Sequence, residues 1–424
     1  MKLQYIETTY TNNVKETTEQ EIIFVNNKEV ENELVNLYPQ VQYQQIEGFG
    51  GAITESAGYI YSLMEAEQKE EIIRKYFEKS GMNYRYVRIS IDSCDFSLDD
   101  AEKSSGRKLE IMLSPWSPPS YMKTNGKRNH GGKLKNNYKK RWSEYICKYI
   151  EEYRKRGYRV TKISLQNEPK AVQTWDSCIF TAEEQKEFLK NYMWPSLVKH
   201  HLEDVEVFIW DHNKERAFEW AETIIDNETQ KMVAGVAFHW YSGDHFQALQ
   251  MIKERFPQKK LLLSEACIEY RKFDACNYLD NAQKYAHDMI GNFNNGMNTF
   301  LDWNLILDEQ GGPNHAGNFC DAPFHFDRKK KQIKESNIFG YIWHFSHFLE
   351  PNSVRIGVST YTDKLEIAAF QSKSKIVFMV LNRTNERISA VIRLRENCAK
   401  IVVSPKAIAT GIISENVKQK EFHS

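Results

Sequence analysis

The sequence predicts an α/β protein: a (β/α)8 TIM barrel with an appended antiparallel β-sandwich domain. Short apolar strands alternate with helical segments from residue 46 to about residue 345, and the helical period then disappears. The length of 424 residues suits one large domain plus a smaller one. Eight strand–helix units in a stretch of this length fit a closed barrel better than an open doubly wound sheet.

The predicted barrel strands are short runs of mostly aliphatic and β-branched residues, each followed by polar or helical sequence. No glycine-rich phosphate loop follows the first of them, which counts against a dinucleotide-binding fold. The runs cover residues 45–49, 86–91, 109–113, 160–165, 205–209, 233–238, 261–263 and 299–301.

Two of the intervening helices can be recognised from their ends. Apolar residues recur at helical spacing after Trp142, and Gly157 is placed to end that helix. The segment Thr181-Ala182-Glu183-Glu184 has the pattern of a capping box and predicts the start of another helix.

Successive antiparallel strands with polar turns between them are expected near the end of the chain, at residues 364–370, 376–381 and 388–392. The first 45 residues also carry β-type runs, and the two ends of a chain often meet. We therefore expect a barrel domain over residues 46–345 and a β-sandwich formed by residues 1–45 together with residues 346–424.

The composition argues against several classes of protein. The 57 basic and 57 acidic side chains cancel, so nothing indicates a nucleic-acid partner. No apolar run approaches the length of a membrane span, and no signal peptide is visible. We expect a cytoplasmic protein with reduced thiols; a secreted protein already processed to its mature form is the alternative. The seven cysteines show no metal-ligand spacing.

Two glutamates follow predicted barrel strands. In a barrel of this kind the functional side chains lie at the C-terminal ends of the strands. Glu168 follows the fourth strand and Glu265 the seventh, so the two side chains converge across the barrel mouth. Two facing carboxylates are what glycosidic bond cleavage needs, one as acid and the other as nucleophile or base. Each glutamate taken alone also fits an ordinary solvated side chain.

The other strand ends supply aromatic, amide and carboxylate side chains, the mixture expected of a sugar pocket. Trp116 and Trp303, taken singly, also fit an apolar core, and His239 also fits a buried structural histidine. The side chains are Asp95 after the second strand, Trp116 after the third, His239 and Tyr241 after the sixth, and Trp303 with Asn314 after the eighth.

Eight short motifs carry a family resemblance. They are EGFGGAITES at residues 47–56, SCDFS at 93–97, SPW at 114–116, NEP at 167–169, HWY at 239–241, SEAC at 264–267, DWNL at 302–305 and GGPN at 311–314. In this order they resemble glycoside hydrolase family 30, the family of acid β-glucosidases known as glucosylceramidases. Any one tripeptide would be weak evidence, but eight collinear matches are highly specific.

The resemblance implies a role for each residue. Glu265 corresponds to the family's nucleophile, Glu168 to its acid/base, and Asn167 to a residue that hydrogen-bonds the sugar 2-hydroxyl. No metal ion or organic cofactor is expected, and the expected partner is a carbohydrate or glycoside. The remaining positions hold or line the sugar site: Asp95, Trp116 and Trp303 for the non-reducing sugar, His239, Tyr241 and Asn314 for the pocket wall, and Arg88 near the nucleophile.

One segment departs from the family pattern. Only about a dozen residues, 97–108, join the second and third strands, where the family has a helix. Either the helix is lost or collapsed, or residues are absent from the sequence. A missing helix would leave the barrel locally open beside Asp95.

The predicted function is a retaining β-glycosidase acting on β-glucosides by double displacement, with carboxyl groups about 5–5.5 Å apart and a raised pKa for Glu168. Small β-glucosides fit better than ceramide-linked ones, because nothing in the sequence indicates membrane access. The alternatives within the family are a β-xylosidase and an endo-β-1,6-glucanase. Outside it they are a non-catalytic carbohydrate-binding protein and a metal hydrolase using Asp211, His212 and His239.

Overall fold

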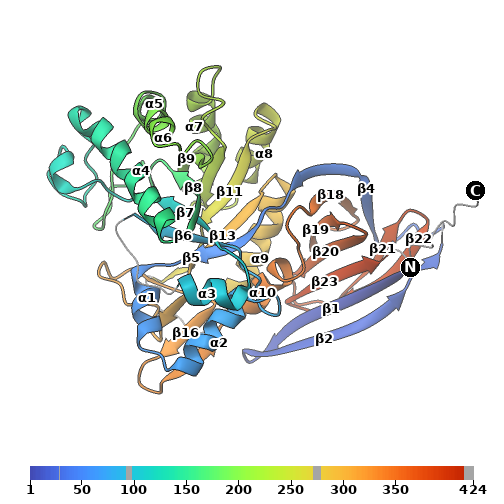
Figure 1. The fold of residues 1–424 in the computed structure, drawn as a ribbon. Helices are drawn as coiled ribbons and strands as arrows, with labels where there is room; N and C mark the ends of the chain where they lie inside the picture. The colour runs from blue at the N-terminus through green and yellow to red at the C-terminus, as the bar shows by residue number, and fades with distance from the viewer. Residues whose placement is uncertain (28, 92–97, 271–277, 415–424) are drawn as a thin grey trace, which may run out of the picture. The chain divides into compact units, whose positions relative to one another are not determined.

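The structure, a computed structural model, describes residues 1–27, 29–91, 98–270 and 278–414. The chain divides into two compact units, one of residues 1–47, 276–294 and 336–424, and the other of residues 48–275 and 295–335. The second unit contains a closed parallel barrel, and the first contains a largely antiparallel sheet (Figure 1).

Eight parallel strands close into the predicted barrel. Each predicted run supplies one strand, with ends shifted by a few residues, so this prediction is confirmed. In chain order the strands are β5 (Gly48–Ala52), β6 (Tyr86–Ser90), β7 (Glu110–Ser114), β8 (Arg159–Ser164), β9 (Glu206–Asn213), β10 (Gly235–His239), β11 (Lys260–Glu265) and β13 (Thr299–Asn304). Six of them contribute to one buried apolar layer: Tyr86, Met112, Phe208, Ala237, Leu262 and Leu301.

The first barrel strand is rich in glycine because its neighbour lies very close. A Cβ atom on Gly50 would lie 2.1 Å from the backbone oxygen of Tyr86 on β6, far inside van der Waals contact. A side chain at this position would therefore separate β5 from β6 and open the barrel at this seam.

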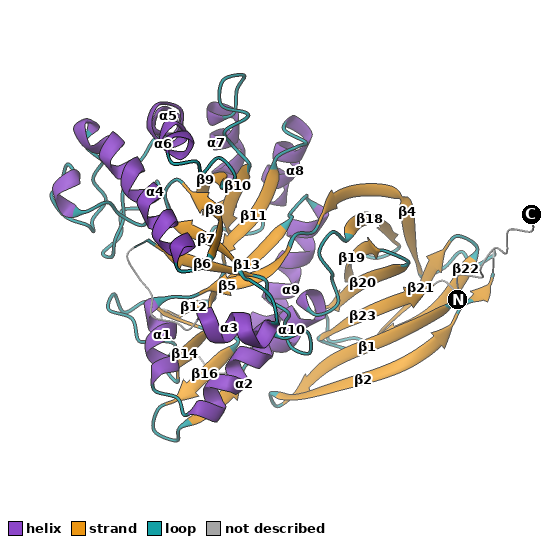
Figure 2. Cartoon of the chain, viewed as in Figure 1, coloured by secondary structure: helices purple, strands orange, loops and turns teal. Residues whose placement is uncertain are grey.

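Helices surround the barrel strands (Figure 2), and the two helix ends recognised in the sequence are present. The Thr181 hydroxyl accepts from Glu184 N–H at 3.2 Å, and the Glu184 carboxylate accepts from Thr181 N–H at 2.8 Å. Gly157 follows the last turn of α4 with φ of 88°, a conformation that glycine adopts without steric cost. The described helices of this unit are α1 (Glu55–Ser62), α2 (Ala66–Phe77), α3 (Leu98–Ser105), α4 (Lys139–Lys155), α5 (Ala182–Phe188), α6 (Trp194–Lys199), α7 (Ala217–Ile224) and α8 (Phe246–Arg255), with short turns η1 (Ser120–Met122), η2 (Asn136–Tyr138), η3 (Leu189–Met193) and η4 (Lys214–Arg216).

The short connection between the second and third barrel strands still holds a helix. This helix, α3, has eight residues, so loss of the helix, one of the alternatives left open by the sequence, is excluded. Ser104 donates to the Glu78 carboxylate at 2.9 Å, and Glu102 accepts from Leu109 N–H at 3.2 Å. These bonds tie the C-terminal half of the two-turn helix to its surroundings. Asp95 lies outside the described residues.

Small strands that the sequence did not predict follow the seventh and eighth barrel strands. β12 (Glu269–Tyr270) pairs with β15 (Phe319–Cys320), and β14 (Ile306–Asp308) pairs with β16 (Phe324–Asp327), which continues to β17 (Gln332–Glu335). They are two to four residues long, too short to leave a periodic pattern.

The first unit is built on one ten-stranded sheet in the order β2-β1-β23-β20-β19-β18-β4-β21-β22-β3. β1 pairs antiparallel with β23, which brings strands from the two ends of the chain into one sheet. Its core is apolar and takes Leu3, Ile367, Phe378 and Ile401 from strands at both ends of the chain.

Two helices also belong to this unit, α9 (Tyr278–Asn294) and α10 (Asn337–Ser346). The strands are β1 (Lys2–Thr11), β2 (Val14–Ile23), β3 (Val25–Asn26), β4 (Leu34–Gln45), β18 (Val354–Thr360), β19 (Leu365–Ser372), β20 (Lys375–Asn382), β21 (Ile388–Leu394), β22 (Asn397–Val403) and β23 (Ala407–Ser414). None of the helices in the described part of the chain has the length and apolar character needed to span a bilayer. The five cysteines within it are unbridged.

Candidate active site

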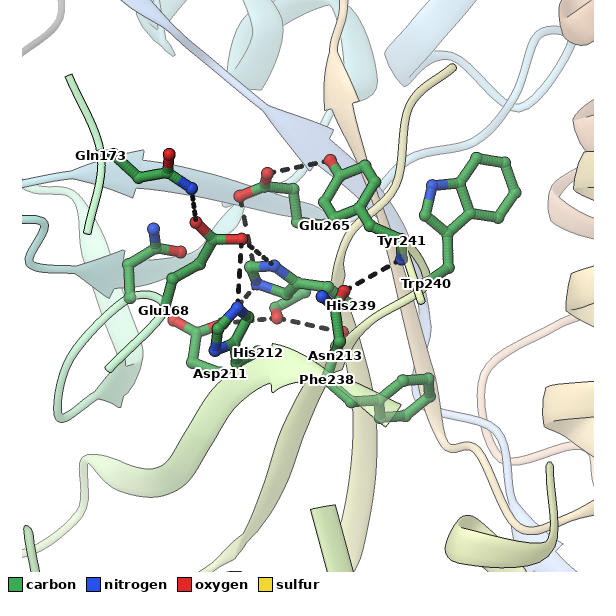
Figure 3. A network of polar contacts seen from close by, with 12 residues as sticks. Glu168, Gln173, Asp211, His212, Asn213, Phe238, His239, Trp240, Tyr241 and Glu265 are labelled. Atoms are coloured by element: carbon green, nitrogen blue, oxygen red, sulfur yellow. Dashed lines mark hydrogen bonds and ion pairs between the residues drawn. The ribbon is translucent and has the colours of Figure 1, made fainter. Parts of the chain in front are cut away.

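Glu168 and Glu265 meet at the C-terminal end of the barrel. Glu265 is the last residue of β11, and Glu168 follows the end of β8 by four residues. Both carboxylates approach the ring of His239, the last residue of β10 (Figure 3). His239 Nδ1 lies 3.5 Å from Glu168 Oε1, and its Nε2 lies 4.0 Å from Glu265 Oε2. One buried imidazole therefore connects the two carboxylates.

Irregularities in the strands aim the side chains inward. The pairing of β9 with β10 skips Asp211, that of β10 with β11 skips Ser264, and that of β13 with β5 skips Trp303. Such bulges re-aim side chains next to functional sites. Glu168 and Asp211 also have left-handed backbone conformations, with φ of 46° and 65°. Each costs on the order of 1–3 kcal/mol, and such strain clusters at active sites.

Arg88 is the central cation of the site. It extends from β6 and is 1% exposed. Its Nη1 donates to Glu265 Oε2 at 2.6 Å, and its Nη2 donates to Asn167 Oδ1 at 2.8 Å and to both oxygens of Asp211 at 3.0 and 3.1 Å. The guanidinium thus links the ends of four barrel strands and fixes the orientation of Glu265.

Asp211 is a site residue that the sequence analysis named only in the metal-hydrolase alternative. Besides Arg88, the hydroxyls of Ser164 and Ser264 each donate to its carboxylate at 2.5 Å, and His239 Nε2 lies 3.2 Å away. Burial alone would raise the pKa of Asp211, but the charge of Arg88 and the contact with His239 hold it well below its ordinary range. Asp211 is therefore a permanent anion, and its position after a strand was the only signal that identified it.

The protonation states in the site differ from the expectation that the pKa of Glu168 is raised. Burial lowers the pKa of His239, but Glu265, Asp211 and Glu168 outweigh it and raise the pKa to about 9. Burial would also raise the pKa of Glu168, but His239 and His212 lower it below its ordinary value. The prediction of a raised pKa for Glu168 is thus wrong for the substrate-free site. Burial instead raises the pKa of Glu265, although His239 and Arg88 oppose this.

Aromatic side chains surround the nucleophile position. Tyr241 donates its hydroxyl to Glu265 Oε1 at 2.9 Å, so both oxygens of this carboxylate have a donor. The rings of Trp116 and Trp303 are stacked with centroids 5.5 Å apart, and the Arg88 guanidinium carbon lies 4.8 and 5.5 Å from their respective centroids. Both tryptophans are half-buried rather than core residues.

Asn314 is not joined to this cluster by any contact of the described residues. Its side chain is exposed and accepts from the backbone N–H groups of Ala316 and Asn318 at 2.8 and 3.2 Å. It shapes its own loop, and its expected place in the pocket wall is not tested. Asn167, in contrast, is 3% exposed and belongs to the cluster through Arg88.

Two further residues contact Glu168. His212 Nε2 lies 3.7 Å from Glu168 Oε1, and Gln173 Nε2 donates to Oε2 at 3.5 Å. Neither was predicted to contact the acid/base residue, because neither lies within the motifs. Among the described residues there is no group of three or more histidine, cysteine, aspartate or glutamate side chains that fits a metal ion. Asp211 is held by Arg88 instead.

Comparison with known proteins gives a family match over most of the chain. The sequence model of the glycosyl hydrolase family 30 TIM-barrel domain matches residues 46–101 and 98–349, and that of the family's β-sandwich domain matches residues 352–411. The two matched segments of the barrel model overlap at residues 98–101, within α3.

Individual relatives agree with this match. A lysosomal acid glucosylceramidase of Mus musculus is 29% identical over 407 residues, covering 85% of this chain and 79% of the relative. A putative glucosylceramidase of Caenorhabditis elegans is 32% identical over 359 residues, with 74% and 69% covered. The solved structure of SrfJ from Salmonella typhimurium has a TM-score of 0.92 and 33% identity over 98% of this chain and 100% of that one. The chain belongs to glycosyl hydrolase family 30 and is a glycoside hydrolase.

Proposed function

We propose that this glycoside hydrolase is a retaining β-glycosidase that acts on β-glucosides by double displacement, with Glu265 as nucleophile and Glu168 as acid/base. The observation that carries the proposal is the meeting of these two carboxylates, from strands four and seven, on the single ring of His239. A pair of carboxylates flanking one point is the arrangement that glycosidic cleavage requires.

Glu265 is held ready for attack on an anomeric carbon. Arg88 donates to one of its oxygens at 2.6 Å and Tyr241 to the other at 2.9 Å. Donors on both oxygens favour the ionised carboxylate and fix its plane, which reduces the entropy lost on reaching the transition state. Because burial opposes ionisation, this donor pair is what makes a buried nucleophile workable.

The proton for the leaving group is stored beside Glu168. His239 carries a proton up to about pH 9, and its Nδ1 lies 3.5 Å from Glu168 Oε1. Transfer of that proton to Glu168 produces a neutral imidazole and a neutral acid without changing the net charge of the site. The lowered pKa of Glu168 in the empty site is therefore compatible with its role as an acid, because the imidazole that carries the proton it needs lies 3.5 Å away.

The two steps then follow from these positions. In the first, a Glu265 oxygen bonds to the anomeric carbon while Glu168 transfers its proton to the departing glycosidic oxygen, and the aglycone leaves as an alcohol. In the second, Glu168 takes a proton from water, whose oxygen attacks the anomeric carbon and releases Glu265. Two inversions retain the β-configuration. The expected separation of the carboxyl groups, about 5–5.5 Å, remains a prediction.

The names of the relatives support a β-glucoside as substrate. The relatives from Mus musculus and Caenorhabditis elegans are named as glucosylceramidases. A relative from Neurospora crassa, 24% identical over 322 residues, is named as an endo-1,6-β-D-glucanase, so a β-1,6-glucan is the second candidate. The stacked rings of Trp116 and Trp303, which lie beside the Arg88 guanidinium, suit the apolar face of a hexose in either substrate.

The test combines a glycoside panel with product stereochemistry. We expect activity on 4-nitrophenyl β-glucoside, with β-xyloside, β-1,6-glucan and detergent-dispersed glucosylceramide as the competing substrates. Glu265→Ala should reduce turnover by about 10⁴-fold or more, and azide should restore it as the α-glycosyl azide. An inverted wild-type product, or a Glu265→Ala enzyme with full activity, would refute the nucleophile assignment.

A further inference from the structure

Among the described residues, three polar side chains contact the carboxylate of Glu168, and they divide between its two oxygens. His239 Nδ1 and His212 Nε2 face Oε1 at 3.5 and 3.7 Å, and Gln173 donates to Oε2 at 3.5 Å (Figure 3). The side chains of Glu168 and His212 are each only 14% exposed, so water screens this contact weakly. The imidazole of His239 already has a role, because it carries the proton that Glu168 needs. The imidazole of His212 has no role in the proposed mechanism.

We propose that His212 is a positioning residue for Glu168, which holds the carboxyl group in the orientation that serves the leaving group and sets the acidic limb of the pH profile. The inference rests on the proposed function of Glu168 as the acid/base residue. It adds a residue outside the motifs to the proton-transfer machinery.

The backbone is built to bring His212 to this position. Neighbouring residues of a regular strand point to opposite faces, so Asp211 and His212 would normally diverge. The bulge at Asp211 and its φ of 65° let both side chains reach the barrel mouth. The His212 ring then lies 5.1 Å from the ring of Trp210 and 6.2 Å from that of His239, measured between centroids. The left-handed backbone at Asp211 therefore goes together with a His212 imidazole that lies next to the Glu168 carboxylate.

The charge state of His212 fits a role different from that of His239. Burial and the charge of His239 lower the pKa of His212, against the opposite effects of Glu168, Glu215 and Asp211. His212 is therefore neutral at neutral pH while His239 is cationic. Its Nδ1 is buried with no hydrogen-bond partner among the described residues, so nothing on that side selects a tautomer. Nε2 can donate to the ionised carboxylate or accept from the protonated one, the two states of an acid/base residue.

Acidic solution changes this arrangement. When His212 gains a proton, a second cation faces Oε1 and stabilises the ionised form of Glu168. The enzyme then loses its general acid at the pH where His212 titrates. Removing the imidazole should extend activity toward lower pH, because only His239 then faces this oxygen as a cation.

The experiment varies the leaving group, since an aglycone that departs easily needs no acid. We would measure kcat/KM of wild type, His212→Phe and His212→Gln on β-glucosides with 2,4-dinitrophenol, 4-nitrophenol and methanol as leaving groups. For His212→Phe we expect a loss of about 10²-fold on the methyl glucoside and less than about 3-fold on the dinitrophenyl glucoside. His212→Gln retains a donor and should recover part of the loss, and the acidic limb should move to lower pH in both variants.

His200→Gln is the matched control. His200 also has a side chain 14% exposed and contacts a glutamate, with Nδ1 2.8 Å from Glu151 Oε1, but it ends α6 and makes no described contact with Glu168. It should show no dependence on the leaving group. Thermal unfolding of each variant reports folding, and His212→Gln decides the question if His212→Phe does not fold.

Equal losses on all three glucosides, or no loss on any, would overturn the proposal, as would an unchanged acidic limb. Failure of the proposed function gives a different result: wild type itself would be inactive on every β-glycoside, or Glu265→Ala would keep its activity.

Discussion

Two fully buried histidines, one in each unit of the molecule, differ in charge: His239 is a cation and His344 is neutral. His239 at the barrel mouth and His344 on α10 in the sandwich unit are both 0% exposed. The pKa of His239 is raised to about 9, whereas burial lowers the pKa of His344 to about 3. Burial lowers the pKa of both imidazoles, so the difference between their pKa values comes from the groups that surround each ring.

His344 is bound by hydroxyl groups. Its Nδ1 and Nε2 each lie 2.8 Å from a threonine oxygen, of Thr410 and Thr8 respectively. Hydroxyls can satisfy a neutral imidazole but cannot compensate a buried charge. His239 faces the carboxylates of Asp211, Glu168 and Glu265, which can. His239 is thus charged because the fold fixes carboxylates around it, and His344 is neutral because the fold places hydroxyls there instead.

The largest effect should come from removing the cation on which the barrel mouth depends. Arg88→Met leaves the carboxylates of Asp211 and Glu265 without their guanidinium, which should lower the free energy of unfolding by about 3–5 kcal/mol and abolish activity. Ile401→Val, in the apolar core of the sandwich, should cost about 0.5–1.5 kcal/mol and leave activity intact. Urea unfolding and an activity assay measure both effects for each variant. Equal losses of stability in Arg88→Met and Ile401→Val would contradict the view that the barrel mouth depends on a buried cation.

Exchanging each histidine for phenylalanine tests the comparison directly. His239→Phe removes the proton store of Glu168 and should reduce kcat/KM by about 10²- to 10⁴-fold. His344→Phe should lower the free energy of unfolding by about 1–3 kcal/mol, because the hydroxyls of Thr8 and Thr410 each lose their hydrogen bond to the imidazole, with kcat of the folded protein unchanged. A catalytic defect in His344→Phe that persists in the folded fraction would be evidence against this division of roles.

The two histidines should also shape stability in opposite pH windows. The unfolded chain binds a proton to His344 below about pH 6.5 but the folded protein only below about pH 3, so stability falls as pH drops through this window. For His239 the folded protein holds its proton up to about pH 9, so stability falls as pH rises from about 6.5 to 9. Each slope approaches about 1.4 kcal/mol per pH unit.

Denaturation at a series of pH values measures both slopes. His344→Phe should flatten only the acidic side of the stability profile and His239→Phe only the alkaline side. The reverse assignment would show that the charges of the two rings are not as described.

The smallest effects should come from single hydroxyl donors. Ser264→Ala removes one of two hydroxyls that donate to the Asp211 anion and should cost about 1.5–3 kcal/mol. Thr410→Val removes a neutral partner of His344 and should cost about 0.5–1.5 kcal/mol. Chemical denaturation resolves this difference, and a larger cost for Thr410→Val would contradict the view that charge makes the barrel-mouth bonds the stronger ones.

The elements that the sequence predicted correctly share one property: their signals are local. The capping box at Thr181 and the end of α4 at Gly157 depend on residues within one helical turn. The strands beyond residue 345 likewise show a local period. The sequence did not predict the small strands β12 and β14–β17, because two to four residues cannot display a period, and it left the presence of α3 open.

The sequence by itself therefore determined the order of strands and helices and placed Glu168 and Glu265 after strands four and seven, because hydrophobic period and strand ends are written in neighbouring residues. Only the tertiary structure decided which side chains meet there. Arg88 lies 123 residues from Asp211 and 177 from Glu265 along the chain, and bulges of one residue at Asp211 and Ser264 aim the groups that hold His239. The charges of His239 and Glu168 follow from those distant contacts, since a pKa is set by what surrounds a group in space.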